Sequence, residues 1–140
     1  MRVMAKAAAA GLIAVQLGGC ALLGDSTVNS PLLVGPWRIE DVNGGGVPDG
    51  ARLTIEFGVD GRVAGVSGCN RFTGPYETRG KNKVRIGPLA TTRKMCPEAL
   101  MDIEAKTLAA LAATRRHQKD ETGAVVLSGG EQRLTLRPGS

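Results

Sequence analysis

Residues 53–57 have the sequence Leu-Thr-Ile-Glu-Phe, and the next four residues are Gly-Val-Asp-Gly. Apolar residues alternate with polar ones in the first segment, which predicts a strand that buries one face. The Asp60-Gly61 pair suits the tight turn of a β-hairpin. Residues 62–67 are therefore expected to return as a second, antiparallel strand beside the first.

The same pattern of short strands and turns continues on both sides of this hairpin. The chain has 20 glycines and 7 prolines, which are too many for a helical bundle and lack the period of collagen. They indicate many turns. Further strands are expected over residues 37–42, 70–78, 83–86, 124–128 and 132–137, with a bulge or bend at Gly74-Pro75.

One segment, residues 97–113, has the period of a helix. Pro97 suits the first turn of a helix, and Ile103, Thr107 and Leu111 fall along one face. Residues 115–121 follow it as a further strand with few apolar residues. The fold class expected is mainly β (α+β): a small, strongly curved antiparallel sheet or barrel, plugged or flanked by one helix.

The beginning of the chain predicts export and lipid attachment. Residues 1–6 are charged and residues 7–17 are mostly apolar, which is typical of a signal peptide and too short to cross a bilayer. The sequence Leu-Gly-Gly-Cys at residues 17–20 resembles a bacterial lipobox. That resemblance implies removal of residues 1–19 and attachment of fatty acyl chains, palmitate among them, to Cys20. The alternative is an ordinary secretory signal with an incidental cysteine.

The lipobox sets the expected organisation of the 140-residue chain. Residues 1–19 are the signal peptide, residues 20–34 are the lipidated cysteine and a tether, and residues 35–140 are one folded domain. Ala21 is not the aspartate that retains some lipoproteins in the inner membrane. The expected location is therefore the outer membrane, facing the periplasm, with the lipid as the membrane partner.

Two cysteines, Cys69 and Cys96, remain in the expected domain. In an oxidising compartment such a pair is interpreted first as a disulfide. Two inert thiols are the alternative, since a redox pair would be closer in sequence. A metal site would need further ligands, and His117 is the only histidine. No metal and no cofactor is therefore expected, and a single histidine disfavours His-based catalytic triads and multi-His metal sites.

The formal net charge of +5 does not indicate a nucleic-acid partner. Part of it lies in the expected signal peptide, and the remaining cations are scattered along the chain. Arg71, Arg79, Arg85 and Arg93 either face anionic lipopolysaccharide or lipid head groups next to the membrane, or belong to a solvated strand face.

Two segments resemble a known family. Gly68-Cys69-Asn70-Arg71-Phe72-Thr73-Gly74, followed by Tyr76, resembles the G-C-N-x-F-x-G-x-Y signature of the META domain (HslJ-like) family. Residues 89–97, LATTRKMCP, look like that family's T-R-M-A-C-P segment. The matching positions are Gly68, Cys69, Asn70, Phe72, Gly74, Tyr76, Thr92, Arg93 and Cys96. The chain departs from the pattern at Lys94, and at Arg116 or His117, where the family often has apolar and aromatic residues.

The resemblance implies a lipocalin-like barrel with one helix, in an envelope setting often linked to stress response. It implies no reaction, so the protein is expected not to be an enzyme. The expected function is a protein-interaction or structural module in the periplasm, with an unknown envelope protein as partner. The alternative is a carrier of a small apolar ligand within the barrel, which predicts an apolar cavity of at least roughly 300 Å³.

Several single residues allow two interpretations. Asn70 either orients a ligand or closes a turn with its own side chain. Glu104 is either a buried carboxylate paired with an arginine such as Arg93, or a partly exposed residue at the helix edge. Trp37, Phe72 and Tyr76 either line a ligand mouth or fill the core.

The lipobox interpretation makes the first prediction. A Cys20→Ser variant is expected to remain an unacylated precursor, because the acyl chain needs the cysteine sulfur. Intact mass spectrometry of the purified protein measures this directly. A variant that still carries the lipid mass of the unaltered protein would show that Cys20 is not the attachment site.

Overall fold

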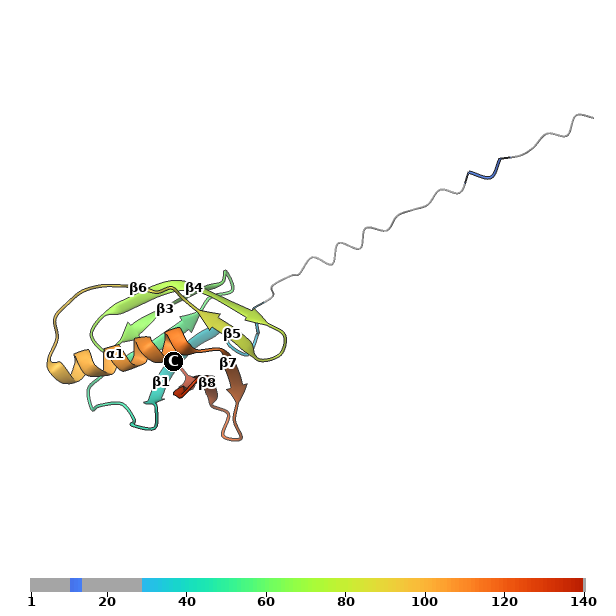
Figure 1. The fold of residues 1–140 in the computed structure, drawn as a ribbon. Helices are drawn as coiled ribbons and strands as arrows, with labels where there is room; N and C mark the ends of the chain where they lie inside the picture. The colour runs from blue at the N-terminus through green and yellow to red at the C-terminus, as the bar shows by residue number, and fades with distance from the viewer. Residues whose placement is uncertain (1–10, 14–28, 140) are drawn as a thin grey trace, which may run out of the picture.

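Eight antiparallel strands close into a barrel in the computed structural model, which describes residues 11–13 and 29–139 (Figure 1). Cys20 and most of the predicted signal peptide lie outside the described residues. The elements are β1 (Gly35–Val42), β2 (Leu53–Phe57), β3 (Arg62–Ser67), β4 (Arg71–Arg79), β5 (Lys83–Ile86), β6 (Ala90–Thr91), α1 (Glu98–Ala113), β7 (Arg116–Lys119), β8 (Val125–Gly129) and β9 (Gln132–Pro138).

The strands follow the order β3-β2-β1-β9-β8-β7-β5-β4, and the pairing of β3 with β4 closes the ring. The short strand β6 adds to the edge of β4. The predicted mainly β fold, a lipocalin-like barrel with one helix, is confirmed. Closure removes the exposed edges that an open sheet of this size would present.

β5 and β7 have the shortest pairing of any two neighbouring strands in the barrel. These strands share one registered residue pair, Lys83 with Arg116. Two backbone hydrogen bonds flank it: Val84 N–H donates to the Arg115 carbonyl at 3.0 Å, and His117 N–H donates to the Asn82 carbonyl at 2.9 Å. We call this short contact the β5–β7 seam.

The hairpin of residues 53–67 forms as its alternation predicts. β2 pairs with β3 in a regular register from Leu53 opposite Ser67 to Phe57 opposite Val63. Leu53, Ile55 and Phe57 point inward and are almost fully buried. The Asp60 carboxylate accepts a hydrogen bond from Arg62 N–H at 3.1 Å, which stabilises the turn.

The helix α1 covers one opening of the barrel. It packs against strands from around the ring, namely β1, β3, β5, β8 and β9 (Figure 1). Ile103, Thr107, Ala110 and Leu111 form its buried face, as the helical period predicts. The helix begins at Glu98, directly after Pro97.

Apolar side chains from every long strand pack in the barrel interior. Leu111 of the helix and Leu127, Leu134 and Leu136 of β8 and β9 are fully buried there. The remaining core residues that define the interior are Leu33, Ile39, Val42, Leu53, Ile55, Phe57, Val63, Phe72, Tyr76, Val84, Ile86, Ile103, Ala110 and Val125. The interior is thus filled mainly by the inward-facing residues that occur at alternate positions along each strand.

The predicted bulge at Gly74-Pro75 is wrong. β4 runs through both residues, and their pairing with β3 is regular, with Pro75 opposite Arg62 and Gly74 opposite Val63. Pro75 has no N–H to donate, and it lies between the β4 residues that pair with β5 and those that pair with β6. No registered partner is left without a donor there, so the strand does not need to bend. The register shift of the sheet lies elsewhere, in β1 between Ile39 and Asp41.

The predicted tether of residues 20–34 is too long at its C-terminal end. Leu33 is fully buried in the core, and Trp37 Nε1–H donates a hydrogen bond to its carbonyl at 2.6 Å. Ser30 N–H donates to Thr78 Oγ1 at 2.9 Å. The folded domain therefore begins near Ser30, about five residues before the predicted boundary at residue 35.

The predicted strand after the helix is confirmed as β7, and it buries the only histidine of the chain. His117 is 1% exposed. Neither ring nitrogen has a hydrogen-bond partner among the described residues. Burial lowers the pKa of His117 below its ordinary value, because the charged imidazolium loses its hydration.

The buried histidine predicts that acid destabilises the fold. The unfolded chain binds a proton at His117 below about pH 6.5 while the folded chain resists it, so the free energy of unfolding falls as the pH drops from 7.5 to 5. His117→Phe should flatten this dependence. It should also stabilise the domain at pH 7.5 by about 1–2 kcal/mol, because an unpaired buried polar group is removed. Urea unfolding at both pH values measures the effect, and an unchanged slope in the variant would contradict it.

Candidate functional site

The residues of the two sequence motifs meet beneath the helix. Glu104, on the buried side of α1, is 7% exposed. Its Oε1 accepts a hydrogen bond from Asn70 N–H at 2.7 Å and lies 3.0 Å from Ser67 Oγ. Its Oε2 accepts from Asn70 Nδ2 at 2.9 Å. The carboxylate therefore joins the helix to the turn between β3 and β4.

The Asn70 side chain extends this network to a third segment. Its Oδ1 accepts hydrogen bonds from Lys94 N–H at 2.6 Å and from Thr92 Oγ1 at 3.0 Å. Its Nδ2 also donates to the Lys94 carbonyl at 3.2 Å. One side chain thus connects the β3–β4 turn, the segment before the helix, and the helix itself. We call Ser67, Asn70, Thr92 and Glu104 the motif cluster.

A disulfide bond between Cys69 and Cys96 lies beside the motif cluster, with Cα atoms 5.9 Å apart. It joins the same two segments that Asn70 connects, so the predicted disulfide is present in the structure. Gly68 lets the helix approach this turn. Its φ is +109°, and a Cβ there would lie 2.9 Å from Ile103 Cγ2, closer than side-chain atoms pack.

The structure corrects the expectations for two motif residues. Glu104 is buried, not partly exposed, and its partners are Asn70 and Ser67, because Arg93 is exposed on the loop before the helix. Asn70 does not close a turn by itself, since its side chain bonds to three distant residues. Every acceptor oxygen of the Glu104 carboxylate already has a donor, so the cluster is suited to holding segments together.

Tyr76 belongs to the core, whereas Phe72 and Trp37, which also pack there, are among the residues that line the groove described below. Phe72 and Tyr76 are buried. Tyr76 packs edge-to-face on Phe57 with ring centroids 5.0 Å apart, and its hydroxyl donates to the Gly58 carbonyl at 2.7 Å. Burial, and then the nearby Asp60 carboxylate, raise the pKa of Tyr76. Trp37 is half-buried beside the same core.

A broad groove of about 1260 Å³ lies on the outer face of β1 to β4. The strand registers place two rows of outward residues across it. The first row is Arg38–Thr54–Val66–Arg71, and the second row is Pro36–Glu56–Ala64–Thr73. On the two central strands, β2 and β3, most of these positions have small side chains. The longer charged side chains in the rows are Arg38, Glu56 and Arg71. We call this surface the outer groove.

The outer groove is not among the sites that the sequence motifs predict. The signal for it was available at Ala64 and Val66, which are small and uncharged at positions that alternation assigns to solvent. Loop residues 47–52 and the segment 90–92 form its sides. A smaller hollow of about 310 Å³ lies between the β1–β2 loop and α1. Neither hollow is the apolar cavity inside the barrel that a carrier predicts.

The groups whose pKa is clearly shifted, Tyr76, His117 and Asp120, do not line the outer groove. Asp120 lies in the turn after β7, where hydrogen bonds from Thr122, its hydroxyl first, lower the pKa of the carboxyl group. Within the described ranges, no three His, Cys, Asp or Glu side chains are placed to hold a metal ion. The described part of the chain also contains no helix with the length and hydrophobicity to cross a membrane.

Comparison with known proteins gives a family and a fold. A model of the META domain matches residues 30–139. A protein from Burkholderia xenovorans solved by NMR is 26% identical, with a TM-score of 0.64 over 78% of this chain and 85% of that one. Another protein solved by NMR is 28% identical, with a TM-score of 0.57 over 75% of this chain and 89% of that one.

A more distant crystal structure shares the fold. It is a DUF4847 family protein from Bacteroides vulgatus, 15% identical, with a TM-score of 0.55 over 78% of this chain and 95% of that one. No curated protein sequence matches the chain significantly.

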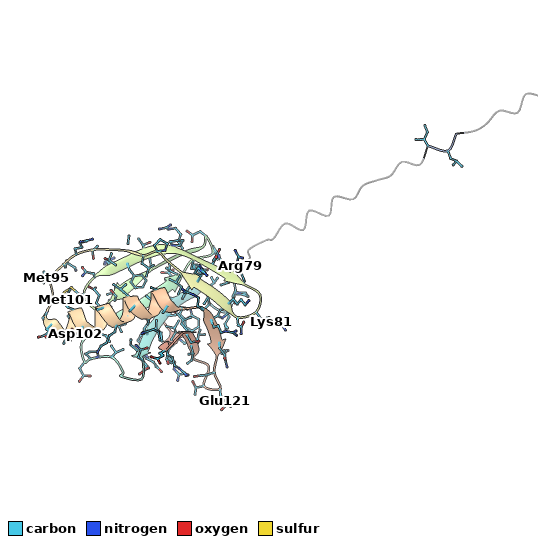
Figure 2. All side chains as sticks on the ribbon, viewed as in Figure 1. Arg79, Lys81, Met95, Met101, Asp102 and Glu121 are labelled. Atoms are coloured by element: carbon cyan, nitrogen blue, oxygen red, sulfur yellow. A yellow bond between two sulfur atoms is a disulfide. The ribbon has the colours of Figure 1, made fainter. Side chains whose placement is uncertain are left out.

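The motif cluster predicts a large stability cost for one truncation. Glu104→Ala should lower the free energy of unfolding by about 3 kcal/mol, because the donors of Asn70 and Ser67 stay buried without their charged acceptor. Asp102→Ala is the matched control. Asp102 is exposed on the same helix (Figure 2), so its loss should cost less than about 0.5 kcal/mol. Denaturant unfolding of the oxidised proteins distinguishes them, and equal costs would contradict the role of Glu104.

Proposed function

The chain belongs to the META domain family, and from this we propose that it is a non-enzymatic envelope lipoprotein that binds a protein partner in the periplasm. A META domain built as a closed barrel fits a small-ligand-binding or a structural module. The more specific proposal is an interaction module, anchored in the outer membrane through Cys20 and acting under envelope stress.

The outer groove is the observation on which this proposal depends. A sheet face with small residues such as Thr54, Ala64 and Val66 at its centre lets another polypeptide approach closely. Arg38 and Arg71, at the two ends of the first row, offer positively charged hydrogen-bond donors. Glu56 in the second row offers a negatively charged acceptor. Such a mixed surface resembles the polar and apolar mosaic of transient protein interfaces.

The filled interior favours this function over the alternative of a carrier. A small apolar ligand inside the barrel would have to displace core side chains such as Leu127, Leu134 and Leu136, which are fully buried. Cores are packed at nearly crystalline density, so that displacement is costly. Binding of a small ligand within the barrel is the alternative function, and the experiment below distinguishes it from binding of a protein.

The chemistry of the described residues supports a non-enzymatic role. The groups with clearly shifted pKa values are Tyr76 and His117 in the core and Asp120 in a turn. None of them lines the outer groove. An enzyme site usually gathers such groups in its cleft.

The disulfide supports an exported location. Disulfides persist in oxidising compartments such as the bacterial periplasm and are rare in the cytosol. The Cys69–Cys96 bond is therefore consistent with the signal peptide and lipobox that the first twenty residues resemble.

Native mass spectrometry tests the proposal on the mature protein gently extracted from its own envelope. We expect the acylated chain with a second protein bound. Ala64→Arg places a long cation in the outer groove and should abolish that complex, while Glu131→Arg, exposed in the turn between β8 and β9, should retain it. A reproducible small-molecule mass that organic solvent removes would instead identify a carrier.

A further inference from the structure

Charge is strongly segregated along the barrel wall. Residues 62–94 contain eight cations and one acid, Glu77. All eight cations are exposed: Arg62, Arg71, Arg79, Lys81, Lys83, Arg85, Arg93 and Lys94. Residues 29–61 have the opposite balance, with two cations and five acids. The positive side of the barrel is therefore formed by β3 to β6 and the loops that connect them.

Three neighbouring strands, β4, β5 and β7, carry cations in one line. Arg79 of β4 lies opposite Lys83 of β5, and Lys83 lies opposite Arg116 of β7. All three side chains are exposed, so they share the outer surface of the barrel. Like charges placed directly across neighbouring strands destabilise a sheet. An arrangement that opposes folding in this way indicates a ligand of opposite charge.

Few acidic side chains offset this line. Of the three cations, Arg79 alone has an ion pair in the described part of the chain, with Glu77 at 3.8 Å. Lys81 in the β4–β5 turn and Arg85 on β5 extend the positive surface. We call Arg79, Lys81, Lys83, Arg85 and Arg116 the basic face.

The chain enters the folded domain beside the basic face. Ser30 N–H bonds to Thr78 Oγ1, next to Arg79 in the sequence. Eight residues lie between Cys20 and Asn29, so these two residues are at most about 30 Å apart even in a fully extended chain. A lipid on Cys20 thus holds this end of the barrel close to the membrane. Figure 2 shows Arg79 and Lys81 at one end of the domain and Met95 at the other.

We propose that the basic face lies against anionic phospholipid head groups of the membrane in which Cys20 is anchored. This inference rests on the lipid anchor of the proposed function. Arginine and lysine side chains bind phosphate oxygens through charge-assisted hydrogen bonds. Basic residues next to a membrane anchor strengthen attachment to anionic lipid by charge attraction.

This orientation leaves the outer groove accessible. Arg71, at the groove, and Arg79, at the basic face, occupy opposite ends of β4. Eight residue steps along a strand span about 26 Å. A barrel resting on Arg79 and its neighbours therefore presents the groove away from the bilayer, where a periplasmic protein has access to it.

Vesicle flotation tests the inference with the mature chain, residues 20–140, carrying Cys20→Ser so that no lipid contributes. This chain retains the whole described barrel and its core. We expect binding to phosphatidylcholine vesicles in which about one lipid in three is the anionic phosphatidylglycerol. We expect little binding to vesicles of phosphatidylcholine alone. Binding should weaken as salt is raised, because the charges are exposed.

A charge-matched pair of variants identifies the face involved. Arg79→Gln, Lys83→Gln and Arg116→Gln together should weaken binding at least about tenfold, since each cation near the surface contributes roughly fivefold. Arg93→Gln, Lys94→Gln and Lys106→Gln remove the same charge from other exposed positions and should change binding little. Circular dichroism of both variants confirms that the barrel is retained.

Two results would overturn the inference: equal loss in both triple variants, which means that net charge alone attracts the protein, or equal binding to neutral vesicles. The lipid anchor is tested separately by the intact mass of Cys20. An acylated chain whose basic face does not bind anionic vesicles would refute this inference and leave the proposed function standing.

Discussion

Three hydrogen bonds between the Glu104 carboxylate and the β3–β4 turn fix the position of the helix on the barrel. A helix that covers a barrel opening must be fixed at a defined position, and apolar contacts alone permit it to slide. Glu104 holds it to Asn70 and Ser67. Asn70 and the Cys69–Cys96 bond then hold the segment that leads into the helix. The family motifs therefore describe a junction, which explains why residues so different in chemistry occur together.

Much of the fold could be predicted from local patterns. Period-two alternation at Leu53–Phe57 and helical period at Glu98–Ala113 each report a buried face, and both elements formed as expected. The partners of Glu104 could not be predicted, because Asn70 is 34 residues away in sequence. The presence of a glutamate in a helix does not reveal which donors its carboxylate will meet in the fold. Leu33 could not be assigned to the core because a buried residue in an irregular segment has no period. The bulge at Pro75 is absent because a proline disrupts a strand only where a neighbouring strand needs its missing N–H, and local sequence does not reveal that pairing.

The barrel offers two chemically distinct surfaces. The outer groove combines small residues such as Ala64 with charges of both signs, whereas the basic face carries one sign. They meet along β4, whose two ends belong to different surfaces. As proposed, one domain engages a protein at the outer groove and anionic lipid at the basic face, both through outward residues, while the inward residues supply packing.

The β5–β7 seam has a consequence for the behaviour of the barrel in solution. In a closed sheet, backbone hydrogen bonds join every strand to both neighbours, and the sheet opens most readily where the fewest of these bonds join two strands. The Val84 and His117 amides, which bridge the seam, are therefore the ones whose protons exchange with solvent soonest among the core strands. The side chain of His117 is almost fully buried, and neither ring nitrogen has a hydrogen-bond partner among the described residues. Opening of the seam at His117 would therefore give this imidazole access to water, which couples local opening of the barrel to proton uptake at one residue.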